Sequence, residues 1–185
     1  RLASGRIVLE GTKRFVTPAA GADGFIVSAR DQDNVYLYYL PATTQGIGVT
    51  LEPRADGTSA GVLGLSGVPV EPAHILAAGA VALSALARSI DEATVMASVE
   101  LYGVMSRALE TTIEYMKTRV QFGRKIGTFQ ALQHRAVDLY IQKALSMGAI
   151  DDAIRTLDGE VSPAIRSATA SRVKSRCADA ALAIT

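Results

Sequence analysis

A short stretch between two long helical patterns constrains the fold of this chain more than any other feature. The first pattern ends near Arg119, and Gly123 and Gly127 interrupt helical structure soon afterwards. Thr128 has a hydroxyl that can cap a second helix. The chain therefore has to reverse direction through one short loop, and we expect a helical hairpin with this loop at its tip.

The loop carries several cationic and amide side chains, namely Arg119, Gln121, Arg124, Lys125 and Gln130. Cations form charge-assisted hydrogen bonds with anions, and the start of a helix adds the positive end of its dipole. Such a cluster suits a polyanion such as a pyrophosphate. The residues alone also allow a solvated basic loop without a ligand.

Two hydrophobic periodicities divide the chain. Residues 1–76 form short apolar runs separated by Gly and Pro turns, which is typical of a small β-sandwich or barrel. In this half we expect a hairpin that pairs residues 6–10 with 13–17 across Gly11 and Thr12, and the strand pattern begins at the first residue.

From about Ala78, apolar residues recur every three or four positions, which predicts one long amphipathic helix. Gly103 inside it predicts a close helix contact. A second helix follows to Asp158, and Ser162 caps a third that begins at Pro163. The fold class is therefore α+β, with a middle β-domain at residues 1–77 and an up-down helical bundle at 78–185. A fourth bundle helix and a starting Met are missing, so we expect a longer parent protein.

Composition excludes several kinds of site. A net charge of +1 gives no general attraction to nucleic acid or anionic membranes. Cys177 is the only cysteine, which excludes an intrachain disulfide, and its Ala-rich surroundings predict a buried thiol. His74 and His134 do not have zinc-site spacing. The most apolar run, residues 75–86, is too short to span a bilayer, so we expect a cytoplasmic protein.

The loop sequence Arg-x-Gln-Phe-Gly-(x3)-Gly-x-Phe-Gln-x-x-Gln-His, at residues 119–134, resembles the signature of the acyl-CoA dehydrogenase flavoproteins. In that family the loop reaches into a neighbouring subunit and binds the pyrophosphate of FAD. The resemblance implies FAD as the cofactor, with Arg119, Gln121, Phe122 and Gln130 as contacts. It also implies a homo- or heteromeric dimer or tetramer with FAD at the subunit interface.

A second segment, residues 13–19, has two interpretations. By its residues alone it is a strand with a buried Phe15, ended by Pro18. By resemblance it flanks the flavin ring, with Phe15 beside the isoalloxazine and Val16 and Thr17 near N5. Pro18 stands where Asn is common in the family, and it has no backbone N–H to donate.

The resemblance also implies a reaction. A Glu removes the α-proton of an acyl-CoA thioester, flavin N5 accepts the β-hydride, and electrons pass to an electron-transfer flavoprotein. Asp91 and Thr94 occupy the positions of a family Asp-x-x-Arg that contacts the substrate, with Thr94 replacing the Arg. We assign no catalytic base: an early family position falls on Ala93, the adjacent Glu92 faces elsewhere, and a partly buried Glu100 suits either a base or an interhelical carboxylate.

Several functions remain open from the sequence. The first is an FAD-dependent acyl-CoA dehydrogenase. The second is a non-catalytic dehydrogenase-like subunit that completes the FAD site of a partner. The third is an oxygen-using relative, such as an acyl-CoA oxidase or a flavin monooxygenase. The last is a helical scaffold without a cofactor.

Overall fold

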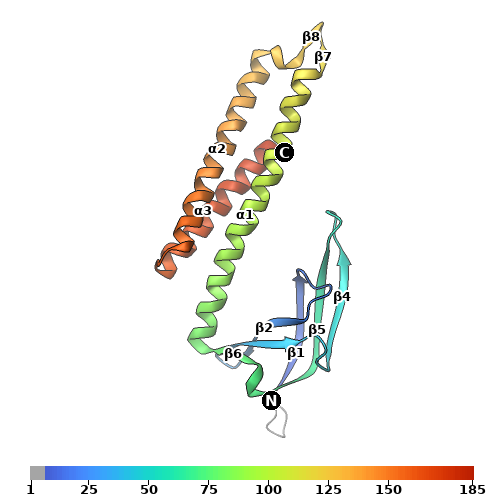
Figure 1. Ribbon diagram of the computed structural model, residues 1–185, viewed down its shortest axis with the longest axis vertical. Coiled ribbons are helices and arrows are strands. Elements are labelled where there is room, and N and C mark those ends of the chain that lie inside the picture. Colours follow the sequence, from blue (N-terminus) through green and yellow to red (C-terminus); the bar gives the residue numbers. More distant parts are fainter. Residues whose placement is uncertain (1–6) are drawn as a thin grey trace. The chain divides into compact units, whose positions relative to one another are not determined.

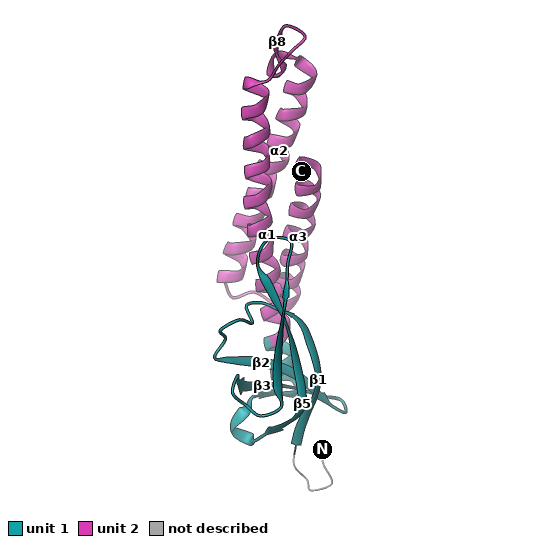
Figure 2. Cartoon of the chain, turned by 90° about the vertical axis from the view of Figure 1, so that its right-hand side faces the viewer, with its two compact units in different colours: residues 1–85 teal, residues 86–185 magenta. Residues whose placement is uncertain are grey.

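The computed structural model describes residues 7–185, so the expected strand pattern at residues 1–6 lies outside the described residues. The chain divides into two compact units, residues 1–85 and 86–185 (Figure 2). The first unit contains the strands of two three-stranded sheets, and the second contains most of the helical residues and one short two-stranded hairpin (Figure 1).

The first unit is a sandwich of two three-stranded antiparallel sheets. One sheet has the order β1-β5-β4 and the other the order β2-β3-β6. Buried residues of both sheets, among them Leu9, Val27, Leu40 and Leu63, form one core, which confirms the expected sandwich. The strands are β1 (Ile7–Val16), β2 (Gly24–Asp31), β3 (Asn34–Pro41), β4 (Ile47–Pro53), β5 (Ser59–Val70) and β6 (Ile75–Ala78), with a 3-10 turn η1 (Pro72–His74) before β6.

The expected hairpin across Gly11 and Thr12 is wrong. Residues 7–10 and 13–16 belong to the single strand β1, which pairs with β5 on either side of a register shift between Leu9 and Gly11. Gly11 has a φ of 134°, so the glycine serves a β-bulge instead of a turn. A strand as long as β5 can pair with both halves of β1, and this long-range pairing is not visible in the local sequence.

The second unit consists of three helices, as the periodicity predicts. They are α1 (Gly79–Thr118), which starts in the first unit, α2 (Gln130–Asp158) and α3 (Pro163–Ile184). Their shared core includes Met105 and Leu109 of α1, Ile150 of α2, and Val173 and Cys177 of α3. No helix among residues 7–185 is long and apolar enough to cross a membrane.

The two expected helix caps differ in outcome. The Ser162 hydroxyl accepts a hydrogen bond from the Ile165 N–H at 3.3 Å, so the predicted cap of α3 is confirmed. The predicted cap of α2 is wrong, because Thr128 Oγ1 donates to the Lys125 carbonyl at 2.7 Å and Phe129 is the N-cap residue. A 3-10 turn, η2 (Ile126–Thr128), precedes α2 and places Thr128 one residue too early.

Two smaller expectations also have different outcomes. Cys177 is fully buried, as predicted, and burial raises the pKa of its thiol. The close contact expected at Gly103 is wrong, because a Cβ built there would meet no atom within 4 Å. Gly103 is exposed on α1.

The buried stripe of α1 gives the first prediction. Met105→Ala should lower the free energy of unfolding by about 2–5 kcal/mol, because Met105 is fully buried among all three helices. Met96→Ala is the matched control, since Met96 lies on the same helix and is 67% exposed, and it should change stability by less than about 0.5 kcal/mol. Denaturant unfolding measures both values, and equal losses would contradict the assignment of the core.

Candidate functional site

The loop between α1 and α2 forms a tight two-stranded hairpin. Strands β7 (Val120–Gln121) and β8 (Arg124–Lys125) pair, with Val120 opposite Lys125 and Gln121 opposite Arg124. The two residues between the strands, Phe122 and Gly123, have φ values of 53° and 77°. Positive φ at both central positions is the geometry of a type I′ turn, which suits the twist of a hairpin.

Phe122 is unusual at the first of these positions. A bulky side chain is seldom found with positive φ, and the ring of Phe122 is 90% exposed. Its one aromatic neighbour among the described residues is Phe129, in an edge-to-face contact with a centroid distance of 6.2 Å. The guanidinium carbon of Arg124 lies 4.2 Å from the Phe129 centroid on a cation–π contact. The Phe122 ring therefore has one aromatic neighbour, and most of its surface is exposed to solvent.

The polar side chains of the loop separate into two groups. One group bonds to the loop itself: Gln121 Nε2 donates to the Val120 carbonyl at 2.8 Å, and Gln133 Nε2 donates to the Gly127 carbonyl at 2.9 Å. The other group, Arg119, Lys125 and Gln130, is exposed and makes no side-chain hydrogen bond or ion pair within residues 7–185. These three side chains are free to bind a ligand.

The loop is anchored on the last turn of α1. The Arg119 carbonyl accepts a hydrogen bond from the Ile126 N–H at 2.8 Å, which closes the base of the hairpin. A Cβ built on Gly127 would lie 2.8 Å from the Met116 carbonyl oxygen, so this approach requires glycine. One short turn and the start of α2 therefore present Arg119, Gln121, Phe122 and Gln130.

The end of β1 carries a second exposed aromatic residue. Phe15 has a φ of 58° and is 74% exposed, so the expectation of a buried Phe15 is wrong. The left-handed backbone turns the ring out of the sheet, and the Arg14 guanidinium carbon lies 5.3 Å from its centroid. Val16 next to it is half-buried and pairs with Gly61 of β5, while Thr17 is exposed.

The two predicted substrate residues lie one turn apart on α1 and have different partners. Asp91 is buried, and its Oδ2 accepts a hydrogen bond from Arg166 Nε of α3 at 3.2 Å. Thr94 lines a shallow apolar groove between α1 and α3, and its hydroxyl donates to the Ile90 carbonyl of its own helix at 2.7 Å. Sequence reasoning missed Arg166, because no local pattern marks a partner 75 residues away.

The two α1 carboxylates that could serve as a catalytic base, Glu92 and Glu100, lie in polar surroundings. Glu92 Oε1 accepts a hydrogen bond from Arg88 Nε at 2.7 Å, on the exposed side of the helix. Glu100 is exposed, so the expectation that it is partly buried is wrong. Neither carboxylate lies in an apolar setting of the kind that tunes a general base.

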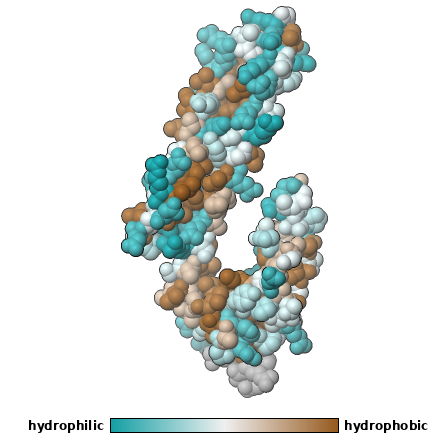
Figure 3. All heavy atoms as spheres, in the orientation of Figure 1, coloured by the Kyte–Doolittle hydropathy of each residue, from teal (hydrophilic) through white to brown (hydrophobic). Residues whose placement is uncertain are grey.

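The helical unit leaves large apolar side chains at its surface, visible as brown areas on its helices in Figure 3. Scattered exposed apolar residues are ordinary, but a run of them over long helices is typical of a surface that meets another protein. The most exposed are Ile90, Met96, Val104, Tyr115, Phe122, Val137, Tyr140, Leu145 and Leu182.

The two glycines of this region give a paired prediction. Gly127→Ala should lower stability by about 1–3 kcal/mol, because the new methyl group overlaps the Met116 carbonyl. Gly103→Ala should raise it by about 0.5–1 kcal/mol, because the position is open and helical. Thermal and denaturant unfolding test both, and a stabilising Gly127→Ala change would mean that the loop does not approach α1 as described.

Comparisons with known proteins show which family this chain resembles. The sequence profile of the acyl-CoA dehydrogenase C-terminal domain matches residues 83–185. The acyl-CoA dehydrogenase FadE27 of Mycobacterium tuberculosis is 34% identical over 138 residues, which cover 72% of this chain and 35% of that protein.

Solved structures have the same fold. The ChsE4-ChsE5 complex from Mycobacterium tuberculosis has a chain that superposes with a TM-score of 0.76 at 28% identity, over 99% of this chain and 50% of that one. A glutaryl-CoA dehydrogenase from Mycobacterium smegmatis, solved in complex with FADH2, superposes with a TM-score of 0.81 at 23% identity, over 96% of this chain and 46% of that one.

This chain spans about half the length of those solved chains, and 20–35% of the length of three mycobacterial relatives that it matches in sequence. The match of the family profile over more than half of the chain decides the classification. The chain belongs to the acyl-CoA dehydrogenase family.

Proposed function

We propose that this chain provides part of the flavin site of an FAD-dependent acyl-CoA dehydrogenase, which oxidises an acyl-CoA thioester between its α- and β-carbons. The observation that carries the proposal is a pair of strained aromatic residues. Phe15 and Phe122 are two of the three non-glycine residues with positive φ among residues 7–185, and both rings are exposed.

Strain of this kind needs a reason. A non-glycine residue in the left-handed region costs about 1–3 kcal/mol, and an exposed ring regains little of that by packing. Positions of this kind concentrate at ligand sites, where a held side chain meets its ligand without reorganisation. Phe15 and Phe122 are also the two aromatic residues that the family resemblance assigns to FAD.

The free side chains of the hairpin fit a flavin dinucleotide. Arg119 can form charge-assisted hydrogen bonds with a pyrophosphate, because its guanidinium has no partner among the described residues. Gln130 begins α2, so its side chain lies where the helix dipole favours an anion. Bound FAD would supply the acceptor for the substrate hydride, and Thr17 at the end of β1 would offer a hydroxyl donor to the reduced ring.

The remaining roles are proposals of the same kind. Acyl-CoA would be the substrate, an electron-transfer flavoprotein the electron acceptor, and the cytoplasm the location. The exposed apolar surface of the helices supports an oligomer with FAD at a subunit interface, as the loop resemblance implies. Residues 1–77 would form the middle domain and 78–185 the helical domain.

A second candidate is a non-catalytic subunit that lends its hairpin to the FAD of a partner. The surroundings of three α1 carboxylates favour this second candidate, because none of them is placed as a catalytic base would be. Asp91 is paired with Arg166, Glu92 is paired with Arg88, and Glu100 is exposed. The hairpin would serve both candidates equally, because its free cations do not depend on these carboxylates.

A visible spectrum of the purified protein, followed by acyl-CoA addition without oxygen, separates the candidates. A flavin band that bleaches supports the dehydrogenase, and rapid reoxidation by oxygen would instead indicate an oxidase or monooxygenase. Flavin that binds only after a homologous subunit is added supports the second candidate. Absence of flavin under both conditions would refute the FAD proposal.

Loss of the Arg119 guanidinium should weaken FAD binding. Arg119→Ala is expected to raise the Kd about 10- to 150-fold, which corresponds to about 1.5–3 kcal/mol for a hydrogen bond to a charged group. Arg107→Ala is the matched control, an exposed arginine earlier on α1, and should leave the Kd within about twofold. Flavin fluorescence titration of the apoprotein measures both, and an unchanged Kd for Arg119→Ala would falsify this role.

The backbone of Phe15 gives a prediction that does not need flavin. Phe15→Gly should be about 1 kcal/mol more stable than Phe15→Ala, because glycine adopts a φ of 58° without steric cost. At an ordinary strand position, Ala is the more stable replacement and Gly the less stable one. Val62 of β5 is the control, and Val62→Ala should be more stable than Val62→Gly. Denaturant unfolding of the two pairs compares them, and both Phe15 variants should bind FAD more weakly than the native protein.

A further inference from the structure

The ion pair between Asp91 and Arg166 differs from the other ion pairs of the described residues. The two side chains are only 12% and 13% exposed, and Arg166 Nε lies 3.2 Å from Asp91 Oδ2. In each of the other ion pairs among residues 7–185, at least one side chain is 44% exposed or more. A buried charge needs its partner far more than a solvated one does.

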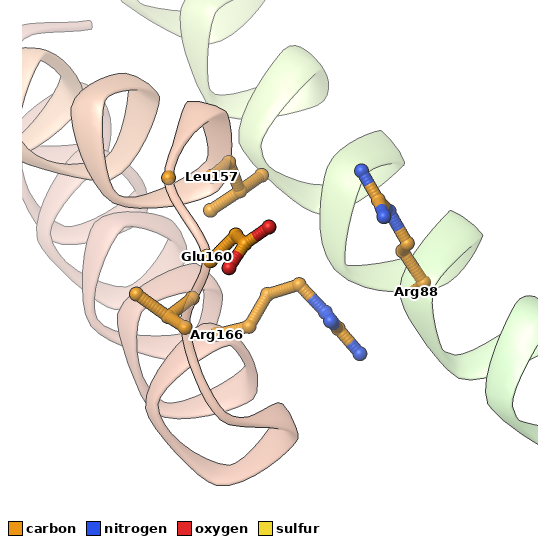
Figure 4. Close-up of a pocket in the computed structure, with 6 residues that line it drawn as sticks. Arg88, Leu157, Glu160 and Arg166 are labelled. Atoms are coloured by element: carbon orange, nitrogen blue, oxygen red, sulfur yellow. The ribbon is translucent and has the colours of Figure 1, made fainter.

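The surroundings commit Arg166 to this contact. Arg166 extends from the first turn of α3 toward α1 and lines a pocket together with Glu160 of the α2–α3 connection (Figure 4). Arg88 of α1 lines the same pocket, but its Nε is bonded to Glu92. Asp91 therefore takes its counter-ion from α3, although a cation lies three residues away on its own helix.

Asp91 and Thr94 lie one turn apart on α1, but they have different partners. Asp91 lies in line with Val95 and Ser98, which are both buried. Ser98 also lines the open groove between α1 and α3, together with Ala93, Thr94 and Ala97. None of these side chains is ionisable, whereas Lys174 on the α3 side of the groove is. Thr94 carries no charge that could replace the family's Arg, and its hydroxyl already donates to the Ile90 carbonyl of its own helix.

We propose that Arg166 is a positioning residue that commits Asp91 to the contact between α1 and α3, so that Asp91 does not bind the acyl-CoA ligand in this chain. The proposal rests on the proposed function for the identity of the ligand. It leaves the specificity of this part of α1 to the uncharged residues on the α1 side of the groove, which suit a hydrocarbon acyl group, while Lys174 of α3 lines the other side.

A double-mutant cycle on the purified holoprotein tests the ion pair. Asp91→Asn and Arg166→Gln should each lower the thermal midpoint by about 5 °C or more, and the double variant should lose no more than the worse single one. Arg166→Lys should recover at least part of the loss, because it restores the charge. The exposed pair provides the control: Arg88→Gln and Glu92→Gln should each shift the midpoint by less than about 2 °C.

Ligand binding separates a positioning role from direct contact. The Kd of a saturated acyl-CoA, followed by perturbation of the flavin band well below the midpoint, should change by less than about threefold in Asp91→Asn. A tenfold weakening in Asp91→Asn with an unchanged midpoint, and no weakening in Arg166→Gln, would overturn the proposal. If the native protein binds no acyl-CoA, the proposed function fails, and the melting cycle alone decides: coupled losses support the ion pair as the role of Asp91, and additive losses overturn it.

Discussion

The helical unit depends on one close approach, between Gly127 and the carbonyl of Met116 on the last turn of α1. This contact lets the chain reverse between α1 and α2 without an extended loop, and the hydrogen bond from Ile126 to the Arg119 carbonyl closes the reversal. Because backbone hydrogen bonds close the turn, the positions of Arg119 and Phe122 on it are defined. A longer or more mobile loop would have to be ordered at binding, which costs about 1–2 kcal/mol per residue in backbone entropy.

Features that depend on nearby residues could be predicted from the sequence. The three helices follow from apolar spacing, and the cap of α3 follows from Ser162 before Pro163. Glycines were harder to interpret, since the same residue type serves a bulge at Gly11, a close approach at Gly127 and an open helical position at Gly103. The difference lies in what surrounds each glycine, and partners distant in sequence decide that.

The positions of the candidate site residues could be predicted from the sequence, but their exposure, backbone conformation and partners could not. The family resemblance selected Phe15, Phe122 and Arg119, and the structure adds that both rings are exposed on left-handed backbone while the arginine has no partner among the described residues. The pairing of Asp91 could not be predicted, because its partner comes from another helix. A residue can therefore keep its place in a family pattern and still have different neighbours.

The two strained phenylalanines are supported by different means, and each support explains why the strain persists. Phe15 follows Lys13, which pairs with Leu63, and precedes Val16, which pairs with Gly61, so a paired sheet fixes the backbone on both sides. Phe122 sits on a hairpin whose flanking residues pair, and its ring rests on Phe129, which in turn lies under Arg124. Relaxing either residue would disturb the strand pairing beside it, which opposes a relief of the strain of about 1–3 kcal/mol. The strain is therefore stored in the free protein, and a ligand that meets either ring has less conformational freedom to remove than it would on a flexible loop.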